Sequence, residues 1–519
     1  MFELNLKSMG SIMEKKPITK VLVANRGEIA IRIMRSCREM GIETVAVFSE
    51  ADRSAMHVRY ANEAYNIGPA PSSESYLNMD KIIATAKASG ADAIHPGYGF
   101  LSENSKFARR CREEGLVFIG PSPESIEMMG DKISARKKMI AAGVPIVPGT
   151  TEKVTSEAEA IKHIKEIGLP VMIKASAGGG GKGMRLVKKE SQITSSLRAA
   201  RSEAKTAFGD DALYIEKYVD SPHHIEFQIL SDKYGNTVHL FERECSVQRR
   251  HQKVVEETPS PIMTPEVRSQ MGAYAVAAAN AANYEGAGTI EFIVDEHLNF
   301  YFLEMNTRLQ VEHPITERVV GVDLVKEQIR IAEGNKLPFN QEDLAQSGHA
   351  IECRIYAEDT DNNFMPNPGT ITHITEPYGF GIRCDGYVYE GYTIPIYYDS
   401  LISKLIVWGR NRDEAIERMR RALYEYKITG VKTTIRFLER IMDTPDFRKG
   451  MYNTHFIEKN SEFLLVKGKC DRNCEDIALI ATYAQYISRI DESKKLNAAP
   501  SEKKETNWKR QLRKFTSRI

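Results

Sequence analysis

The sequence predicts a multidomain protein, with an α/β region first and α+β regions after it. Its 519 residues exceed the size of a typical single domain, so we expect two to four domains. Strand and helix patterns alternate over residues 17–130, which is typical of a parallel sheet with helices on its faces. From His224 onward, strands joined by short turns indicate antiparallel pairing instead.

Charge and composition exclude several classes of function. Lys and Arg total 71 against 70 Asp and Glu, so the chain has no large net charge with which to attract nucleic acid or an anionic membrane. The longest apolar stretch, residues 271–282, is too short to cross a bilayer, and the first sixteen residues lack the apolar segment of a secretory signal. None of the seven cysteines forms a Cys-x-x-Cys pair, which favours free thiols in a reducing compartment. We therefore expect a cytoplasmic protein, with Met9 and Met13 as alternative natural starts.

The first region opens as a β-α-β unit, with strands at 20–24 and 43–48 around a helix at 28–40. The rhythm continues through a helix at 81–88, a strand at 91–95, a helix at 105–114 and a strand at 116–119. The first turn, residues 25–28, has one glycine where a dinucleotide site needs three, so an NAD-dependent dehydrogenase is disfavoured. Residues 49–52 carry two acids, which we interpret as a solvated loop rather than a ribose site.

Residues 149–218 have the pattern of a small α+β unit. Its predicted elements are a helix at 156–166, a strand at 171–175, a strand at 184–187, a helix at 192–206 and a strand at 213–218. Two antiparallel pairs follow, 226–230 with 237–241 and 288–294 with 300–304. Beyond Glu458 we expect an amphipathic helix at 477–490, a polar stretch at 491–506 and a basic tail at 508–518.

Five glycines stand among the six residues from Gly178 to Gly183, between two predicted strands. A Walker loop needs Ser or Thr after its lysine and then a helix, whereas Gly183 follows Lys182 and a strand comes next. A glycine-rich turn between strands is a hairpin whose backbone N–H groups can cover phosphates. Because ordering five glycines costs much conformational entropy, we favour a lid that closes on a nucleotide; the alternative is a mobile surface hairpin.

Two lysines accompany this run. Lys174 lies in the apolar strand that enters it, where neutralising a phosphate and pointing to solvent are both consistent with the pattern. Lys132 follows Gly130 and Asp131 and has the pattern of an ordinary surface residue.

Residues 302–312 carry the most informative pattern. If this stretch is extended, alternate side chains lie on one face. That face would hold two acids, two amides and a guanidinium: Glu304, Asn306, Arg308, Gln310 and Glu312. Ordinary amphipathic strands also alternate, but the neighbouring predicted strand adds Glu291 beside Glu304.

This face predicts a metal and anion site. Two carboxylates and an amide oxygen repel one another unless a cation joins them, and hard oxygen ligands suit Mg²⁺ or Mn²⁺, which normally arrive on nucleotide phosphates. Farther along, Arg308 and Gln310 can bind a planar oxyanion, on which Glu312 can act as a general base. The charged run at 248–253, followed by Glu256 and Glu257, is either a solvated face or the source of cations for this site.

The sequence closely resembles the biotin carboxylase family of the ATP-grasp superfamily. The resemblance runs from about Ile18 to Lys459. It is carried by motifs that occur in the family's order, at residues 24–30, 95–103, 174–184, 242–253 and 304–314. One departure is Lys182, where some members have arginine, and another is the continuation of about sixty residues beyond Lys459.

The resemblance implies an ATP-grasp fold, with ATP held between a lid and a body. The implied domains are a flexible leader (1–16), an N-terminal parallel-sheet domain (17–130), a lid domain that includes the glycine hairpin (131–218), a body with a C-terminal antiparallel-sheet domain (219–460) and a helical, basic extension (461–519). The basic tail would either dock a partner or be a disordered end.

The site residues implied by the resemblance fall into four groups. ATP contacts are expected at Lys132, Lys174, Gly180, Gly181, Glu216, Lys217, Val219, His224, His251, Glu291 and Glu304, with residues 216–219 as the hinge that reads adenine. The metal ligands are expected to be Glu291, Glu304 and Asn306. Bicarbonate is expected at Lys253, Arg308, Gln310, Val311 and Glu312, and biotin at Arg354. The implied catalytic residues are Lys253, Arg308, Glu312 and Arg354.

The implied reaction is the ATP- and bicarbonate-dependent carboxylation of biotin through carboxyphosphate, with Mg²⁺ or Mn²⁺. No Met-Lys-Met biotinylation motif occurs in the chain, so the resemblance implies a separate biotin carrier protein and a carboxyltransferase subunit, with a homodimer of this chain. We expect an acetyl- or propionyl-CoA carboxylase. The alternatives are the biotin carboxylase subunit of a pyruvate carboxylase, another ATP-grasp carboxylate ligase and a catalytically silent nucleotide-binding protein.

Overall fold

A five-stranded sheet forms the first region, and every adjacent pair of its strands is parallel, as predicted. The strands run in the order β3-β2-β1-β4-β5: β1 (Lys20–Val23), β2 (Glu43–Ser49), β3 (Glu63–Gly68), β4 (Ala93–His95) and β5 (Val117–Phe118). The helices of this region are α1 (Gly27–Glu39), α2 (Met56–Tyr60), α3 (Met79–Ala88), α4 (Ser105–Glu113) and α5 (Pro123–Gly130). The computed structural model describes residues 16–154, 156–175, 184–209, 211–465 and 479–490.

Arg26, in the turn after β1, makes contacts that correct the interpretation of residues 49–52 as a solvated loop. The Arg26 guanidinium bonds the Asp52 carboxylate through Nε at 2.6 Å and Nη2 at 2.7 Å, and the Tyr76 hydroxyl donates to the same carboxylate. Asp52 is fully buried, so the prediction of a solvated loop is wrong for this residue. The pairing lies far along the chain from Asp52, which is why local sequence could not reveal it.

The small unit has a three-stranded antiparallel sheet of its own. Its strands run β7-β6-β8: β6 (Val171–Ala175), β7 (Arg185–Val187) and β8 (Leu213–Lys217). Helices α7 (Glu157–Ile167) and α8 (Ile193–Phe208) pack their apolar faces on it. The Ser156 hydroxyl accepts from the Glu159 N–H to start α7, and Gly168, with a φ of 77°, ends it. The predicted glycine lid, residues 178–183, falls outside the described residues, whereas its two flanking strands are described.

The core of the small unit extends from Val154 to Ile215. Helix α6 (Lys132–Ala141) instead packs Ala135 and Met139 into the core of the body.

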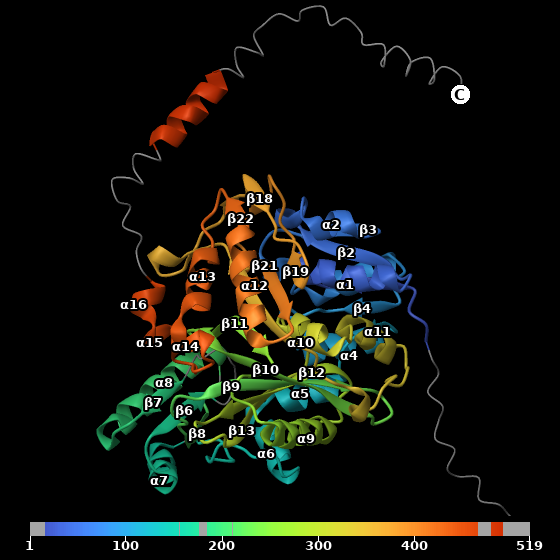
Figure 1. Ribbon diagram of the computed structural model, residues 1–519. Helices are drawn as coiled ribbons and strands as arrows, with labels where there is room; N and C mark the ends of the chain where they lie inside the picture. The colour runs from blue at the N-terminus through green and yellow to red at the C-terminus, as the bar shows by residue number, and fades with distance from the viewer. Residues whose placement is uncertain (1–15, 155, 176–183, 210, 466–478, 491–519) are drawn as a thin grey trace, which may run out of the picture. The chain divides into compact units, whose positions relative to one another are not determined.

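An eight-stranded antiparallel sheet forms the body (Figure 1). Its order is β13-β12-β9-β10-β11-β14-β21-β19, with β9 (His223–Ser231), β10 (Thr237–Arg249), β11 (Gln252–Thr258), β12 (Gly286–Val294), β13 (Phe300–Asn306), β14 (His349–Tyr356), β19 (Ile382–Gly386) and β21 (Leu401–Gly409). Both predicted hairpins are present, since β9 pairs β10 and β12 pairs β13. Strand β10 extends well beyond its prediction and carries the charged run into the sheet.

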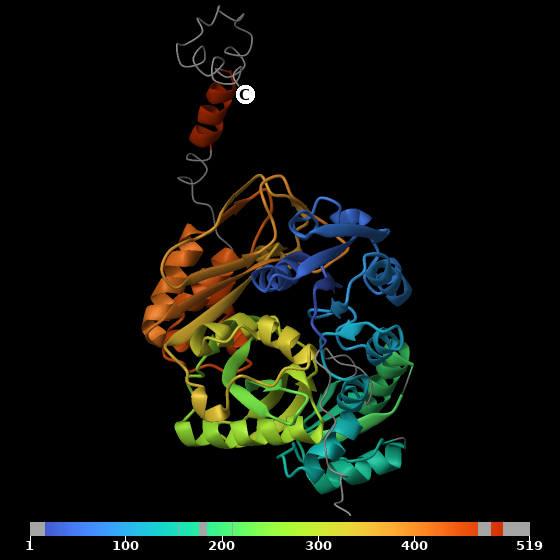
Figure 2. The same ribbon diagram turned by 90° about the vertical axis from the view of Figure 1, so that its right-hand side faces the viewer.

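Helices cover this sheet on both faces (Figures 1 and 2). Helix α9 lies along β9 and β10, and α12 packs on β14 and β21 over the face that carries Ile351, Cys353 and Leu405. The helices of the body are α9 (Pro265–Ala281), α10 (His313–Val320), α11 (Leu324–Ala332), α12 (Arg412–Glu425), α13 (Ile435–Asp443), α14 (Pro445–Arg448), α15 (Phe456–Lys459) and α16 (Ser461–Leu464). Short ladders join β15 (Glu358–Asp359) to β16 (Met365–Pro366), β17 (Gly369–Thr370) to β20 (Thr393–Ile394) and β18 (His373–Thr375) to β22 (Lys427–Thr429).

The stretch from 302 to 312 is not one strand, which corrects the sequence-based prediction. Strand β13 ends at Asn306, and α10 begins at His313 with Pro314 in its first turn. Between them, the Thr307 N–H and the Arg308 Nε donate to the Glu103 carboxylate at 3.1 and 2.8 Å. These bonds to the first domain replace a sheet ladder, so Arg308 and Glu312 reach the site from a turn.

Residues 466–519 form a second unit, of which 479–490 are described and helical, as predicted. Leu479, Ile480, Tyr483, Tyr486 and Ile487 of this helix are exposed. The predicted polar stretch and basic tail lie outside the described residues. Within the described ranges, no helix combines the length and apolarity needed to span a membrane.

Candidate active site

A cavity of about 850 Å³ is lined by residues of the small unit and of the eight-stranded sheet. It brings together all the described residues that the sequence singled out for ATP, metal, bicarbonate and biotin. These are Lys132, Lys174, Glu216, Lys217, Val219, His224, His251, Lys253, Glu291, Glu304, Asn306, Arg308, Gln310, Val311, Glu312 and Arg354. Gly180 and Gly181 lie outside the described residues.

The small unit contributes a buried ion pair. Lys174 of β6 bonds the Glu216 carboxylate of β8, so Lys174 does not point to bulk solvent. Burial works against the charged ammonium, but Glu216 and Tyr214 together raise the pKa of Lys174. The Lys217 ammonium turns toward the small unit and donates to the Gly168 and Leu169 carbonyls at 3.1 and 3.0 Å.

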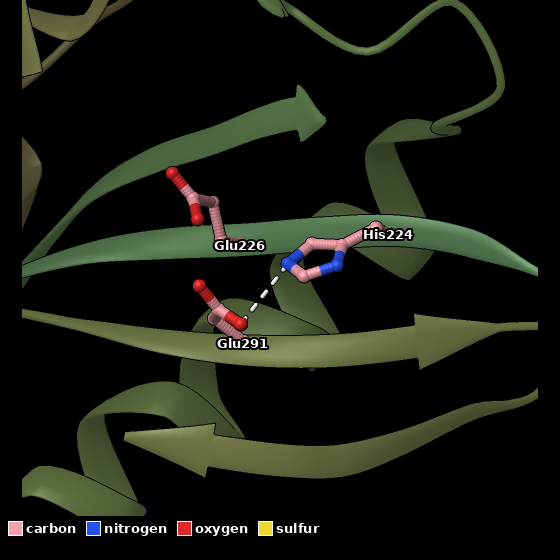
Figure 3. A group of neighbouring side chains, drawn as sticks. All are labelled: His224, Glu226 and Glu291. Carbon is pink, nitrogen blue, oxygen red and sulfur yellow. Dashed lines mark ion pairs between the residues drawn. The ribbon is translucent and has the colours of Figure 1, made fainter. Parts of the chain in front are cut away.

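Strands β9 and β12 present a second group, drawn in Figure 3. Glu226 and Glu291 are direct cross-strand partners, and His224 Nε2 lies 3.1 Å from Glu291 Oε2. Burial opposes ionisation of Glu291, yet Lys253 and His224 hold its pKa well below the usual range. Glu291 is therefore an anion at neutral pH and is ready to meet a cation.

Lys253 of β11 lies at the centre of three buried carboxylates. Its ammonium is 2.6 Å from Glu226 Oε2, 3.0 Å from Glu291 Oε1 and 2.6 Å from Glu312 Oε1. Burial alone would lower the pKa of Lys253, but these carboxylates raise it well above its ordinary value. All three ammonium protons have partners, which fixes the side chain in the site.

Glu226 is a site residue that sequence reasoning missed. It is fully buried, bonds Lys253 and accepts from Arg243 Nε at 2.5 Å. Its position two residues after His224, on the same face of a predicted strand, was the available signal.

The predicted metal ligands come together at the edge of the sheet. Glu291 and Glu304 are cross-strand partners, and Asn306 Nδ2 donates to Glu291 Oε1 at 2.8 Å. Burial, and then the negative charge of Glu291, raise the pKa of Glu304, while Lys132 Nζ lies 4.0 Å from its carboxylate. Two carboxylates that repel each other are hard donors that Mg²⁺ or Mn²⁺ prefers, so Glu291 and Glu304 fit such an ion; Asn306 would add its amide oxygen once the amide group, whose Nδ2 faces Glu291, turns over.

The predicted anion-binding residues are also adjacent. Arg308 Nη1 donates to Gln310 Oε1 at 2.9 Å, and Nη2 donates to Asn306 Oδ1 at 3.2 Å. Glu103, which orients this guanidinium through Nε, belongs to a motif at 95–103 to which the sequence assigned no role.

Arg354 of β14 contacts Glu312, the residue that the sequence analysis named as a candidate base. Its Nη2 lies 3.0 Å from Glu312 Oε2, and its Nε donates to Glu256 Oε1 at 2.6 Å. Burial opposes ionisation of Glu312, but Lys253 and Arg354 hold its pKa well below the usual range. Because Glu256 is buried in β11 and only 13% of the Lys253 side chain is exposed, a solvated face is the wrong interpretation for them. His251, with a φ of 67° in the β10–β11 turn, lies at the cavity wall.

Comparisons with known proteins place the chain in a family. The biotin carboxylase N-terminal domain matches residues 17–126, the ATP-binding domain of carbamoyl-phosphate synthase L chain matches 131–340, and the biotin carboxylase C-terminal domain matches 352–459. The chain is 54% identical over 442 residues to "Biotin carboxylase 1" of Bacillus subtilis, which covers 85% of this chain and 98% of that one. The chain belongs to the biotin carboxylase family. It is thus a ligase, as the sequence motifs predicted.

Other biotin-dependent carboxylases show the same similarity. A pyruvate carboxylase component of Methanothermobacter thermautotrophicus is 57% identical over 441 residues, covering 85% of this chain and 90% of that one. The biotin carboxylase domain of Hydrogenobacter thermophilus 2-oxoglutarate carboxylase, a dimer solved with MgADP, ADP and bicarbonate, is 51% identical with a TM-score of 0.84. It covers 87% of this chain and all of that chain. The ATP-grasp architecture predicted from sequence is therefore confirmed.

Proposed function

We propose that this biotin carboxylase uses ATP and bicarbonate to carboxylate biotin held on a separate carrier polypeptide. The observation that carries the proposal is the position of Lys253, whose ammonium touches the base candidate Glu312 and the metal-ligand candidate Glu291 at once. Anion, nucleotide and base would therefore meet within one cavity, which is what joining bicarbonate to a phosphoryl group requires.

In the proposed nucleotide site, Lys174 and His224 face the phosphates, and the backbone of residues 216–219 reads the adenine. Glu291, Glu304 and Asn306 would hold Mg²⁺ or Mn²⁺, which neutralises phosphate charge when bound. Lys132, 4.0 Å from Glu304, adds positive charge at the same edge. The glycine run at 178–183 would cover the phosphates and exclude water from the reaction.

In the first proposed step, Glu312 removes the proton from bicarbonate. The freed oxygen attacks the γ-phosphorus of ATP; the new O–P bond forms as the bond to ADP breaks, giving carboxyphosphate. Lys253, Arg308 and Gln310 hold the anion during attack. When bicarbonate shares the positive charge of Lys253 and Arg354 with Glu312, the pKa of Glu312 rises, which makes Glu312 a better base.

In the second proposed step, carboxyphosphate separates into CO₂ and phosphate. As the phosphate takes the proton from biotin N1′, negative charge develops on the ureido oxygen, which Arg354 stabilises from the cavity wall. The nitrogen then attacks CO₂, and the charge passes to the new carboxylate.

A direct test measures ADP formation with free biotin as the acceptor. Biotin should stimulate bicarbonate-dependent ADP release, and removal of bicarbonate should abolish the stimulation. Stimulation by another carboxylate without biotin would identify a different ATP-grasp ligase instead.

We further infer that the chain forms a homodimer and works with a biotin carrier protein and a carboxyltransferase subunit. Exposed Tyr378 and Phe380 support the dimer, since 73% and 75% of their surfaces are free in the single chain. Light scattering of the wild type and of Phe380→Glu tests this inference; a monomeric wild type would refute it.

The final acceptor depends on the carboxyltransferase, because the acceptor does not enter this half-reaction. An acyl-CoA remains our prediction, and pyruvate is the alternative that the name of the Methanothermobacter relative supports. Co-purification of the partner, followed by assays with acetyl-CoA, propionyl-CoA and pyruvate, distinguishes the two.

A further inference from the structure

Glu352 is a carboxylic side chain with no assigned role and an unusual environment. It lies on β14 two residues before Arg354, on the face opposite Ile351 and Cys353, and it is fully buried. Neither of its carboxyl oxygens has a hydrogen-bond partner among the described residues. A buried polar group of this kind is rare in a folded protein and calls for a physical explanation.

Charged groups surround Glu352 on every side. Glu256 is its cross-strand partner on β11, Arg354 is its neighbour on β14, and Lys404 lies on β21 opposite Arg354. Tyr98, from the motif at 95–103, donates a hydrogen bond to the Glu28 carboxylate of α1. Burial, Glu28 and the charge of Glu352 all raise the pKa of Tyr98. Helix α10 contributes His313 near Lys404, with Glu312 directly before it; burial keeps the pKa of His313 well below its ordinary value, so its imidazole stays neutral.

The cations that face Glu352 are already engaged by other groups. Arg354 bonds Glu256 and Glu312. The Lys404 ammonium donates to the Val311 carbonyl at 2.9 Å and lies 3.2 Å from Glu28 Oε2. Glu352 is thus the carboxyl group without a cation of its own, and an ionised carboxylate buried in this way is very costly.

A proton on Glu352 removes this cost. In agreement, burial raises the pKa of Glu352 well above its ordinary value even though Lys404 opposes the rise. Burial also raises the pKa of Glu256 to about 7, but Glu256 has the Arg354 guanidinium as a direct partner. The two carboxyl groups are cross-strand neighbours, and a proton is favoured on the member that lacks a cation.

We propose that Glu352 is a neutral carboxylic acid that keeps the positive charge of Arg354 available to the ureido oxygen of biotin. An ionised Glu352 would be a third carboxylate around this one guanidinium, after Glu256 and Glu312. Glu352 is therefore a positioning residue that acts through Arg354, and this assignment rests on the proposed function.

The first experiment is independent of activity. Infrared spectra of the full chain between pH 6 and 9 should contain a carboxylic-acid C=O band that disappears in Glu352→Gln. Thermal unfolding should agree with the spectra. The folded wild type keeps a proton that the unfolded chain releases above its ordinary pKa, so wild-type stability falls as pH rises toward the folded pKa. The unfolding equilibrium should change by up to about tenfold per pH unit more in the wild type than in Glu352→Gln.

A matched control is Glu327→Gln on α11. Glu327 is also buried with a raised pKa caused mainly by burial, but it pairs with Arg330 on its own helix and lies away from Arg354. Glu352→Leu serves as a second neutral variant if Glu352→Gln does not fold. An unchanged infrared band together with an unchanged pH dependence of unfolding in the neutral variant would overturn the proposal.

The second experiment measures biotin-dependent ADP formation against pH. Glu352→Gln should retain activity within about threefold of wild type near pH 7, since the neutral acid and the amide are isosteric and uncharged. As pH rises, biotin-dependent turnover of Glu352→Gln should begin to fall at a higher pH than that of wild type. The pH profile of Glu327→Gln should match that of wild type. An identical alkaline limb in Glu352→Gln would refute the link to Arg354. A wild type with no biotin-dependent turnover would instead refute the proposed function, while the infrared result would still stand.

Discussion

Two lysines with little exposed surface face the cavity, and their surroundings differ. Lys174 lies on the three-stranded sheet of the small unit and has one carboxylate partner, Glu216. Lys253 lies on the eight-stranded sheet and has three, supplied by three separate segments of the body. A lysine with one partner can exchange that carboxylate for a phosphate at modest cost. A lysine with three partners is a fixed part of the site, because moving it leaves several buried anions without a cation.

The largest expected effect is that of Lys253→Met. The change leaves Glu226, Glu291 and Glu312 without their shared cation, so both turnover and stability should fall. Breaking a buried charge pair costs about 3–5 kcal/mol. Thermal unfolding should show the loss at pH 7 and a smaller one at acidic pH, where the carboxylates are protonated. A stable Lys253→Met at pH 7 would contradict the idea that this lysine is fixed.

The next effect is that of Glu312→Gln, which removes the base candidate and keeps the shape of the side chain. Turnover should fall by about 10²- to 10⁴-fold, as expected for the loss of a general base. Nucleotide affinity, measured by calorimetry, should stay close to that of wild type. Unchanged turnover would refute the role of Glu312.

A smaller effect is expected at Lys174. Lys174→Met should lower turnover by about 10²-fold by removing one phosphate contact, and it should also destabilise the small unit by leaving Glu216 with only the more distant Arg136 guanidinium, at 3.9 Å. The double variant Lys174→Met/Glu216→Gln should recover stability in thermal unfolding but not turnover. Recovery of both would mean that the pair is purely structural.

The smallest effect on activity is expected at Glu257, a buried carboxylate outside the cavity. Burial opposes its ionisation, but His349 and Arg412 hold its pKa at about 2. A depressed pKa stabilises the fold at neutral pH by about 3 kcal/mol, and this stability is lost as pH falls from about 4.5 to about 2.

Thermal unfolding of wild type and Glu257→Gln between pH 2 and 7 checks this prediction. The two curves should differ at pH 7 and converge near pH 2, while turnover at pH 7 should change little. A large loss of turnover without a loss of stability would assign Glu257 to the site rather than to the fold.

Most strands and helices of the described chain could be predicted because their patterns are local. The parallel β1–β2 pair and the β9–β10 and β12–β13 hairpins follow from apolar runs and short turns. Residues 302–312 were interpreted as extended because polar and apolar residues alternate along most of the stretch; bonds from Thr307 and Arg308 to Glu103, about two hundred residues earlier, take the place of a strand ladder after Asn306. A contact of that kind leaves no mark on local periodicity.

The site residues also fall into two groups, those that lie close together in the sequence and those that only the fold brings together. Glu304, Asn306, Arg308, Gln310 and Glu312 are close in sequence, so their chemistry was visible before their geometry. Glu226, Glu256 and Glu352 are separated along the chain and become neighbours of this group only through the register of β9, β11, β12 and β14.

By itself, the sequence determined the order of the elements, the family motifs and which residue types were available for metal, anion and base. Tertiary structure alone decided which carboxylate receives a cation. Lys253 reaches three of them and Arg354 two, while Glu352 is left with none. The reason is physical: the charge state of a buried acid depends on its burial and on the groups within a few ångströms, and both are set by how distant strands pair.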